Sequence, residues 1–178
     1  GSKVKSAIWS LPGEGGKVIA FGSLENWGGE NTEELIVAAD ASIATAASKL
    51  PEGYHQQPTK TIFGLPESWV ESDSLKSERV EILQGACRKL LLKPVGFIVT
   101  DEAIAHWLKK EEGGLPSVIL GTLEEAEITV SLIVEGKYLG SKLVGRSDNL
   151  ALDFEEGLLR FDYKNVLPGR ILLLDGDT

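Results

Sequence analysis

Apolar and polar residues alternate along the first part of the chain with the period of two that is typical of strands. Residues 3–10 (KVKSAIWS) and 17–24 (KVIAFGSL) show this pattern, and glycines and a proline lie between them. Two such runs joined by a short turn predict a β-hairpin. Further strands are predicted for the apolar runs 59–65, 95–100 and 170–174, and for a three-stranded meander within residues 119–145.

Four longer stretches carry apolar residues at every third or fourth position, which predicts four helices. The first begins at Asn31, whose side chain is a good N-cap, with Glu34 three residues later. Its inward face is rich in alanine, so another element is expected to pack close to it. The helices are predicted over residues 31–50, over 77–91, from a cap at Thr100 or Asp101 to Gly113, and over 149–161. The side chains expected to face inward are Ile36, Ala39, Ile43, Ala46, Ala47 and Leu50; Val80, Leu83, Cys87 and Leu90; Ile104, Trp107, Leu108 and Glu111; and Leu150, Phe154, Leu158 and Phe161.

The elements follow one another in the order β-β-α-β-α-β-α-β-β-β-α-β. Strands separated by helices imply right-handed crossovers onto a partly parallel sheet, and hairpins add antiparallel strands. The sequence therefore predicts a mixed α/β protein. The loop at Leu115 and Pro116 is the expected boundary between two parts, because a second strand-rich region begins there.

Composition narrows the classes of partner. The chain has 178 residues, of which 42% are hydrophobic and 25% are charged, as in an ordinary folded protein. The formal net charge of −9 disfavours binding to the phosphates of nucleic acid and to anionic lipid. No apolar run approaches the roughly 20 residues that cross a bilayer, so direct membrane insertion is not expected. The single cysteine, Cys87, suits a helix core and a reducing cytosol, and the expected location is cytoplasmic.

Three segments of the chain resemble the actin-like ATPases, and within that superfamily the bacterial members of the FtsA and PilM type from cell division and type IV pili. Residues 3–8 (KVKSAI) resemble the chain just after the family's first phosphate motif. Residues 87–108 (CRKLLLKPVGFIVTDEAIAHWL) resemble the family's helix, proline link, strand and following helix. Residues 117–158 (SVILGTLEEAEITVSLIVEGKYLGSKLVGRSDNLALDFEEGL) resemble the strand, phosphate turn, hairpin and helix that open the second lobe.

The resemblance implies a ribonuclease H-like fold with mixed sheets, arranged as two small lobes that each combine a β-meander with αβ units. The first lobe would cover residues 3–114, incomplete at its N-terminus and with residues 31–50 as a helical insertion. The second lobe would cover residues 115–178 and be incomplete at its C-terminus. In this family a partner peptide or a neighbouring subunit docks on the lobes. The resemblance therefore also implies a protein partner or self-association, with the chain at the inner face of the membrane where a partner holds it there.

The resemblance also places a nucleotide site, with Gly121, Thr122, Gly145 and Gly176 at its positions. At the second phosphate turn the family has Asp-x-Gly-Gly-Gly-Thr, because a carboxylate helps to hold Mg²⁺ and glycines let backbone N–H groups approach phosphates. Here the aspartate is replaced by Leu120, and none of the three glycines remains. The six positions are occupied by Leu120, Gly121, Thr122, Leu123, Glu124 and Glu125.

A glutamate in a phosphate cradle opposes anion binding. Two like charges about 4 Å apart repel by roughly 4 kcal/mol at an effective dielectric constant of about 20, which is about three powers of ten in affinity. The expected function is therefore a non-catalytic scaffold or protein-interaction module, with no cofactor and no catalytic or metal-binding residues. The alternative is a fragment of a functional ATPase whose full-length protein binds ATP and Mg²⁺.

Two other patterns point to enzyme chemistry only weakly. Asp175 and Asp177 after an apolar strand resemble the aspartyl-phosphate motif of the haloacid dehalogenase class, but no following helix and lysine complete it. His55 and His106 lack the cysteines or paired acids of a metal site.

One apolar pair lies in an otherwise polar stretch. Trp69 and Val70 occur within residues 64–74 (GLPESWVESDS). The pair predicts either a contact with a protein partner or a tryptophan that folds back over a sheet edge.

Overall fold

The computed structural model describes residues 2–11, 16–54 and 60–175. The chain forms two compact units: unit 1 consists of residues Gly1–Phe63 and Glu71–Gly96, and unit 2 consists of Gly64–Val70 and Phe97–Thr178. The predicted boundary between residues 114 and 115 therefore lies within unit 2, and residues 97–114 pack with the meander that follows them. The mixed α/β class is confirmed, whereas the ribonuclease H-like arrangement in two actin-like lobes stays a prediction.

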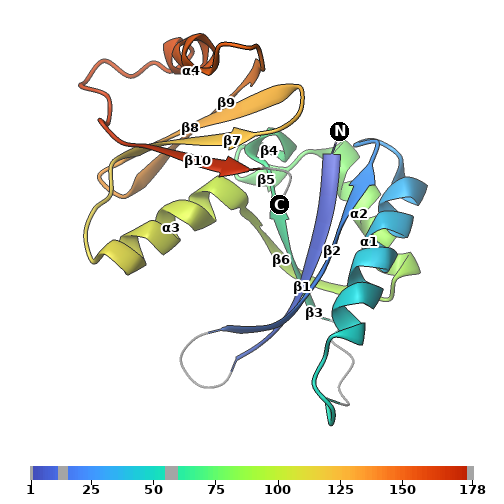
Figure 1. The fold of residues 1–178 in the computed structure, drawn as a ribbon. Helices are drawn as coiled ribbons and strands as arrows, with labels where there is room; N and C mark the ends of the chain where they lie inside the picture. Colours follow the sequence, from blue (N-terminus) through green and yellow to red (C-terminus); the bar gives the residue numbers. More distant parts are fainter. Residues whose placement is uncertain (1, 12–15, 55–59, 176–178) are drawn as a thin grey trace. The chain divides into compact units, whose positions relative to one another are not determined.

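Unit 1 begins with the predicted hairpin. Strands β1 (Ser2–Ser10) and β2 (Lys17–Trp27) pair antiparallel, and helix α1 (Thr32–Ser48) packs on them (Figure 1). The predicted N-cap is confirmed, because Asn31 Oδ1 accepts hydrogen bonds from the backbone N–H groups of Glu33 at 2.8 Å and Glu34 at 3.4 Å. Glu34 Oε2 in turn accepts from Gly28 N at 2.9 Å, which ties the loop before the helix to its first turn.

The inward face of α1 differs from the predicted one. Its buried residues are Leu35, Ala38, Ser42 and Ala46, whereas Ile36, Ala39 and Ile43 are half-buried and Ala47 is exposed. The face is rotated because the hairpin approaches the helix at a small residue: a Cβ built on Gly22 would lie 2.2 Å from the Ser42 carbonyl oxygen. Close packing against α1 was predicted correctly and Ala46 is buried as predicted, but the other residues predicted to face inward are half-buried or exposed.

The other elements before residue 100 are a second helix and short strands, of which residues 64–70 and 97–99 belong to unit 2. Helix α2 (Ser77–Lys89) buries Leu83, Ala86 and Cys87, of which Leu83 and Cys87 were predicted. Strands β3 (Lys60–Leu65) and β6 (Lys93–Val99) pair with each other. The prediction of a buried strand over residues 59–65 was wrong in its burial, because only Leu65 is buried among the residues described there. The stretch 64–74, expected to be a polar loop, contains a 3-10 helix η1 (Glu67–Trp69) and most of a small hairpin of β4 (Val70–Glu71) and β5 (Ser74–Leu75).

Unit 2 is built on a four-stranded sheet in the order β10-β7-β8-β9 (Figure 1). Strands β7 (Val118–Leu123), β8 (Glu127–Val134) and β9 (Lys137–Gly145) form the predicted antiparallel meander. Strand β10 (Ile171–Asp175) pairs parallel to β7, as the helical crossover between them requires. The hairpin turn between β8 and β9 has Glu135 and Gly136 at φ angles of 50° and 71°.

Helices cover both faces of this sheet. Helix α4 (Leu150–Leu159) packs Phe154, with Leu150 and Leu158, on one face of the meander, as the apolar stripe predicted. Helix α3 (Thr100–Glu112) packs Ala105 and Leu108 on the other face. The two apolar layers explain why β8 is buried almost throughout and why Ile128, Val130, Leu132 and Ile133 are fully buried.

The start of α3 was predicted incorrectly, and its inward face was predicted in part, because Leu108 is buried and Ile104 packs beside it. The N-cap is Val99, and both Thr100 and Asp101 lie inside the helix. Asp101 is buried with Ala105 and Leu108, whereas Trp107 is 57% exposed. In the part of the chain that the structure describes, no helix is both long and apolar enough to cross a membrane.

Candidate functional site

Of the six positions that resemble a phosphate turn, residues 120–123 lie in strand β7 of unit 2, and Glu124 and Glu125 lie in the turn that follows. Gly121 is in β7, where it pairs with Leu173 of β10 on one side and Val130 of β8 on the other. Leu120 is fully buried, and Thr122 pairs with Thr129. The backbone around Gly121 is therefore occupied by two strand ladders, which take the N–H groups that a phosphate cradle needs free.

The absence of a side chain at Gly121 has a packing reason. A Cβ built there would lie 2.1 Å from Phe154 Cζ, 2.7 Å from Phe154 Cε1 and 3.3 Å from Leu173 Cδ2. Such distances are far below van der Waals contact, so only glycine fits beneath the phenyl ring of α4. The space that a phosphate would fill above this residue is taken by an apolar side chain.

The turn after β7 is closed by its own hydrogen bonds. Glu124 N donates to Glu127 O at 2.9 Å, and the guanidinium of Arg146 donates to Glu124 O at 2.8 Å. Arg146 N also donates to Ala126 O at 2.9 Å. A shallow, open depression beside the turn is lined by Glu125, Arg146, Ser147 and Asp148. Its two carboxylates outnumber its one guanidinium, so its charge does not favour a phosphate.

Among the other predicted site residues that are described, Gly145 lies beside this turn as the register partner of Glu127. Gly145 ends β9, and a Cβ built on it would meet nothing within 4 Å. Trp69 and Val70 are half-buried in η1 and β4. His106 Nε2 lies 3.9 Å from Glu102 Oε1, and both side chains are exposed, as expected for a solvated pair. Among the residues described, no three His, Cys, Asp or Glu side chains are placed to hold a metal ion. The predictions for His55, Gly176 and Asp177 fall outside the described residues.

A polar cluster that the sequence did not predict lies on the α3 face of the sheet. Glu67 Oε2 accepts hydrogen bonds from the Tyr138 hydroxyl at 3.0 Å and from the Ser141 hydroxyl at 2.7 Å, and also from Ser141 N. Next to it, Asp101 Oδ2 accepts from the Ser131 hydroxyl at 2.7 Å. Ser131 and Ser141 are partners in the β8–β9 register, so the two carboxylates are attached to the same rung of the sheet. We call these five residues the Glu67–Asp101 cluster.

Burial and charge perturb the acid–base behaviour of this cluster. Burial raises the pKa of Asp101; the negative charge of Glu67 adds to this effect, and the hydrogen bond from Ser131 opposes it. Burial also raises the pKa of Tyr138, with further contributions from the charges of Glu67 and Asp101, so its phenol stays neutral and donates. Unlike these, Cys87 has a pKa raised by burial alone, which marks it as an unreactive core thiol.

Comparison with known protein families gave no matching model, and comparison with curated protein sequences gave no match.

One sequence signal could have indicated the Glu67–Asp101 cluster. Ser131 is the polar residue in the middle of the apolar run VSLIV, within a strand that two helical layers cover. A buried hydroxyl requires a hydrogen-bond partner, so a polar side chain above the strand was to be expected. The identity of that partner could not be read, because Asp101 is 30 positions away from Ser131 in the chain.

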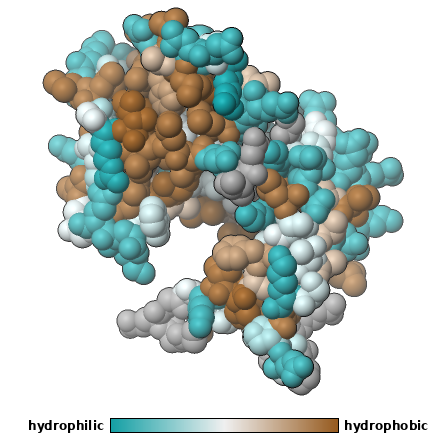
Figure 2. All heavy atoms as spheres, viewed as in Figure 1, coloured by the Kyte–Doolittle hydropathy of each residue, from teal (hydrophilic) through white to brown (hydrophobic). Residues whose placement is uncertain are grey.

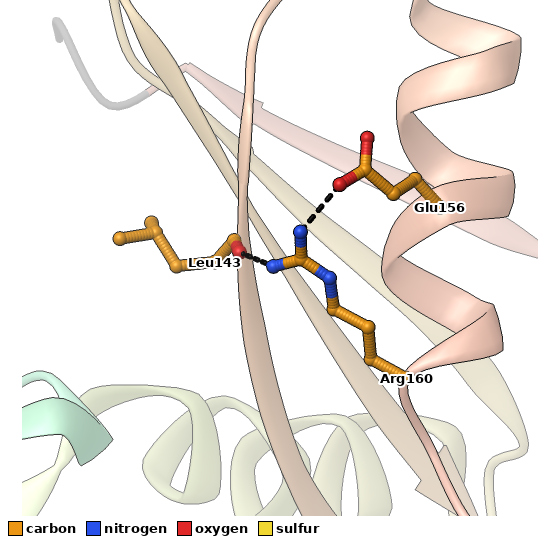
Figure 3. Close-up of polar contacts among 3 residues, drawn as sticks. All are labelled: Leu143, Glu156 and Arg160. Atoms are coloured by element: carbon orange, nitrogen blue, oxygen red, sulfur yellow. Dashed lines mark hydrogen bonds and ion pairs between the residues drawn. The ribbon is translucent and has the colours of Figure 1, made fainter.

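The two outer edges of the sheet differ in the hydrogen-bond partners of their backbone groups. On β9, Glu67 takes the N–H of Ser141, and the Arg160 guanidinium donates to the Leu143 carbonyl oxygen while Glu156 holds it in place (Figure 3). On the opposite side, no strand among those described pairs with the outer edge of β10. Strand β10 also exposes 53% of Ile171 and 54% of Leu173. Figure 2 shows hydrophobic side chains gathered over the region of unit 2 that contains β10.

Proposed function

We propose that this chain is a non-catalytic, actin-like scaffold that acts by binding a protein partner or a second copy of itself, in a bacterial membrane-associated assembly of the pilus or cell-division kind. The observation that carries the non-catalytic part is the packing of Gly121 beneath Phe154. The actin-like part rests on the sequence resemblance described above.

Nucleotide binding at the family position would require several changes at once. The N–H groups around Gly121 would have to leave the ladders to β8 and β10, and Phe154 would have to move from its core position. Glu124 and Glu125 would then face the phosphates with two like charges. Each change opposes ATP binding, and they act in the same direction.

Protein binding is supported by the contrast between the sheet edges. An edge strand with unpaired backbone groups and apolar side chains is a place where another strand can be added. Side chains occupy part of the β9 edge, whereas β10 presents Ile171, Leu173 and Leu174 at least partly exposed. A strand from a second copy or from a partner would bury this apolar surface.

Isothermal titration with ATP and Mg²⁺ tests the non-catalytic assignment. We expect no saturable binding at millimolar nucleotide, with AMP and GTP titrated under the same conditions as controls for weak non-specific heat. Micromolar binding of ATP that disappears without Mg²⁺ would overturn the proposal and favour the alternative, a fragment of a functional ATP-binding ATPase.

Sedimentation velocity over a range of protein concentrations tests the self-association arm. We expect the sedimentation coefficient of Leu173→Lys to rise less with protein concentration than that of the unaltered chain. The lysine places a charge among the exposed apolar side chains of β10, where the second copy would bind. Leu159→Lys is the matched control, since Leu159 is 78% exposed in the same unit but lies at the end of α4. An equal loss of association in both variants would argue against β10 as the contact.

A further inference from the structure

Residues 64–70 are the short segment of unit 2 that is separated along the chain from the rest of that unit. The segment is attached to β9 through Glu67, whose Oε2 accepts hydrogen bonds from Tyr138 and Ser141. The backbone of β9 is shaped for this carboxylate. Gly140 has a φ of +122°, and a Cβ on it would lie 3.4 Å from Glu67 Oε1.

A second carboxylate lies on the neighbouring strand. Asp101 is 8% exposed and accepts a hydrogen bond from Ser131, which is 1% exposed and is the register partner of Ser141. Side chains directly opposite each other on two strands have Cβ atoms about 4.5–5.5 Å apart. The carboxylates of Glu67 and Asp101 therefore lie at adjacent positions of a largely buried site, where they repel each other when both are charged.

Neutral groups are the donors to both carboxylates. No lysine, arginine or histidine within the described ranges forms an ion pair with Glu67 or Asp101. The ionisable groups that face Asp101 are Glu67 from η1 and Tyr138 from β9, and β8 supplies the uncharged Ser131. On α3 itself, Glu102 and His106 form an exposed pair of their own.

We propose that Glu67 and Asp101 form a proton-sensitive latch, which holds segment 64–70 firmly on β9 when Asp101 is protonated and loosens it when Asp101 is ionised. The two carboxylates differ in how freely they can move. Asp101 is on a 13-residue helix packed on the sheet, whereas Glu67 begins a three-residue 3-10 helix. Repulsion between them is therefore relieved by displacement of the short segment, and this segment carries Trp69 and Val70.

The direction in which pH changes the attachment of segment 64–70 follows from the protonation of Asp101. Burial and the charge of Glu67 favour the neutral form of Asp101, so its carboxyl is protonated before an ordinary aspartate as the pH falls. The protonated carboxyl keeps acceptor capacity for the Ser131 hydroxyl and no longer repels Glu67. The attachment is thus firmer below the folded-state pKa of Asp101 than above it.

Amide hydrogen exchange of Ser141 measures the latch, because its N–H donates directly to Glu67. The carbon-13 shift of the Asp101 carboxyl, recorded on the same full-length sample, defines the pH range in which Asp101 ionises. We expect the protection factor of Ser141, corrected for the intrinsic exchange rate, to fall about five-fold across that range. The amide of Leu24, in the β1–β2 ladder of unit 1, is the internal reference and is expected to show no such change.

Three variants separate the latch from general effects of pH. Asp101→Asn keeps an acceptor for Ser131 without the charge, and should make Ser141 protection independent of pH. Glu67→Gln should lower the apparent pKa of Asp101, a readout that does not depend on the strength of the attachment. Glu102→Gln, one position along the same helix and exposed, should leave both readouts as in the unaltered chain. A protection factor that does not fall as Asp101 ionises, or that falls equally in Asp101→Asn, would overturn the proposal.

Discussion

Gly121 lies directly beneath the ring of Phe154, and a Cβ on Gly121 would lie 2.1 Å from Phe154 Cζ. Gly121→Ala is therefore expected to destabilise unit 2 by about 1–3 kcal/mol, because overpacking forces the ring out of its core position. Urea unfolding followed by circular dichroism measures this loss.

Gly145→Ala is the matched control, since a Cβ at that position meets nothing within 4 Å. Its effect is expected to stay within about 0.5 kcal/mol. Shortening the ring with Phe154→Leu should make Gly121→Ala cost less than it does alone. Strictly additive effects of the two substitutions would contradict the packing explanation of this glycine.

A second prediction concerns Ser42, which is fully buried on α1. Its hydroxyl donates to Ser23 O at 2.7 Å and accepts from Ser6 N at 2.8 Å, so it satisfies backbone groups of both strands of the hairpin. Ser42→Ala is expected to cost about 1–3 kcal/mol, because it leaves buried partners without a hydrogen bond. Ser48→Ala, on an exposed part of the same helix, should change the unfolding free energy far less. Equal losses would show that the hairpin does not depend on this hydroxyl.

The helix α1 also shows why the elements could be predicted from the sequence more accurately than their faces. Hydrophobic spacing locates a helix but favours its largest apolar residues, such as Ile36 and Ile43, as the inward ones. The observed face instead uses small residues around Ser42, because the hairpin approaches closely at Gly22. The alanine-rich pattern predicted a close neighbour, but periodicity contains no information about where along the helix that neighbour comes within reach of a serine.

The same limit applies to the candidate site. The sequence showed that the stretch around Gly121 lacks the aspartate and glycines of the actin-like motif that it resembles, but it did not show the packing reason for Gly121 itself. Asp101 was expected, as one of two alternatives with Thr100, to be a helix cap, since such residues commonly begin helices. It is buried instead, because Ser131 on β8 provides a donor for its carboxylate. A pairing over 30 positions depends on the sheet register, which only the folded chain establishes.

A third prediction uses this buried pair. Ser131→Ala removes the hydrogen-bond donor of Asp101, and is expected to cost about 1.5–3 kcal/mol at neutral pH. The pKa of Asp101 is raised in the folded chain, so its contribution to stability is fully present below its unfolded pKa and is lost as the pH rises through the folded one. Loss of the Ser131 hydroxyl raises the folded pKa further and enlarges that loss.

The cost of Ser131→Ala should therefore shrink towards acidic pH, where Asp101 is neutral. Unfolding free energies of both chains across the pH range in which Asp101 ionises measure the trend. A cost that is the same at every pH would mean that Ser131 acts only by filling space.

A fourth prediction concerns the turn between β8 and β9. Glu135 has a φ of 50°, a left-handed conformation that asparagine adopts more easily than glutamate, and Gly136 follows it with a φ of 71°. Glu135→Asn should raise the unfolding free energy by about 0.5 kcal/mol. Glu125→Asn, in the neighbouring turn, controls for the lost charge, and an equal gain in both would argue against the turn geometry as the cause.

The last prediction follows from the side chains at the edge of β9. Arg160 donates to the outward carbonyl of Leu143, and Glu156, one helical turn earlier, holds the guanidinium (Figure 3). Arg160→Ala should change the unfolding free energy by less than about 1 kcal/mol, because the ion pair is largely exposed. Its main expected effect is on association, because the freed carbonyl makes β9 open to pairing with another strand. Arg88→Ala, on the exposed side of α2, makes the net charge equally more negative and leaves β9 unchanged. Faster sedimentation at high concentration for Arg160→Ala, but not for Arg88→Ala, would show that Arg160 prevents another strand from pairing with β9. Identical sedimentation of the two variants would show that Arg160 has no such role.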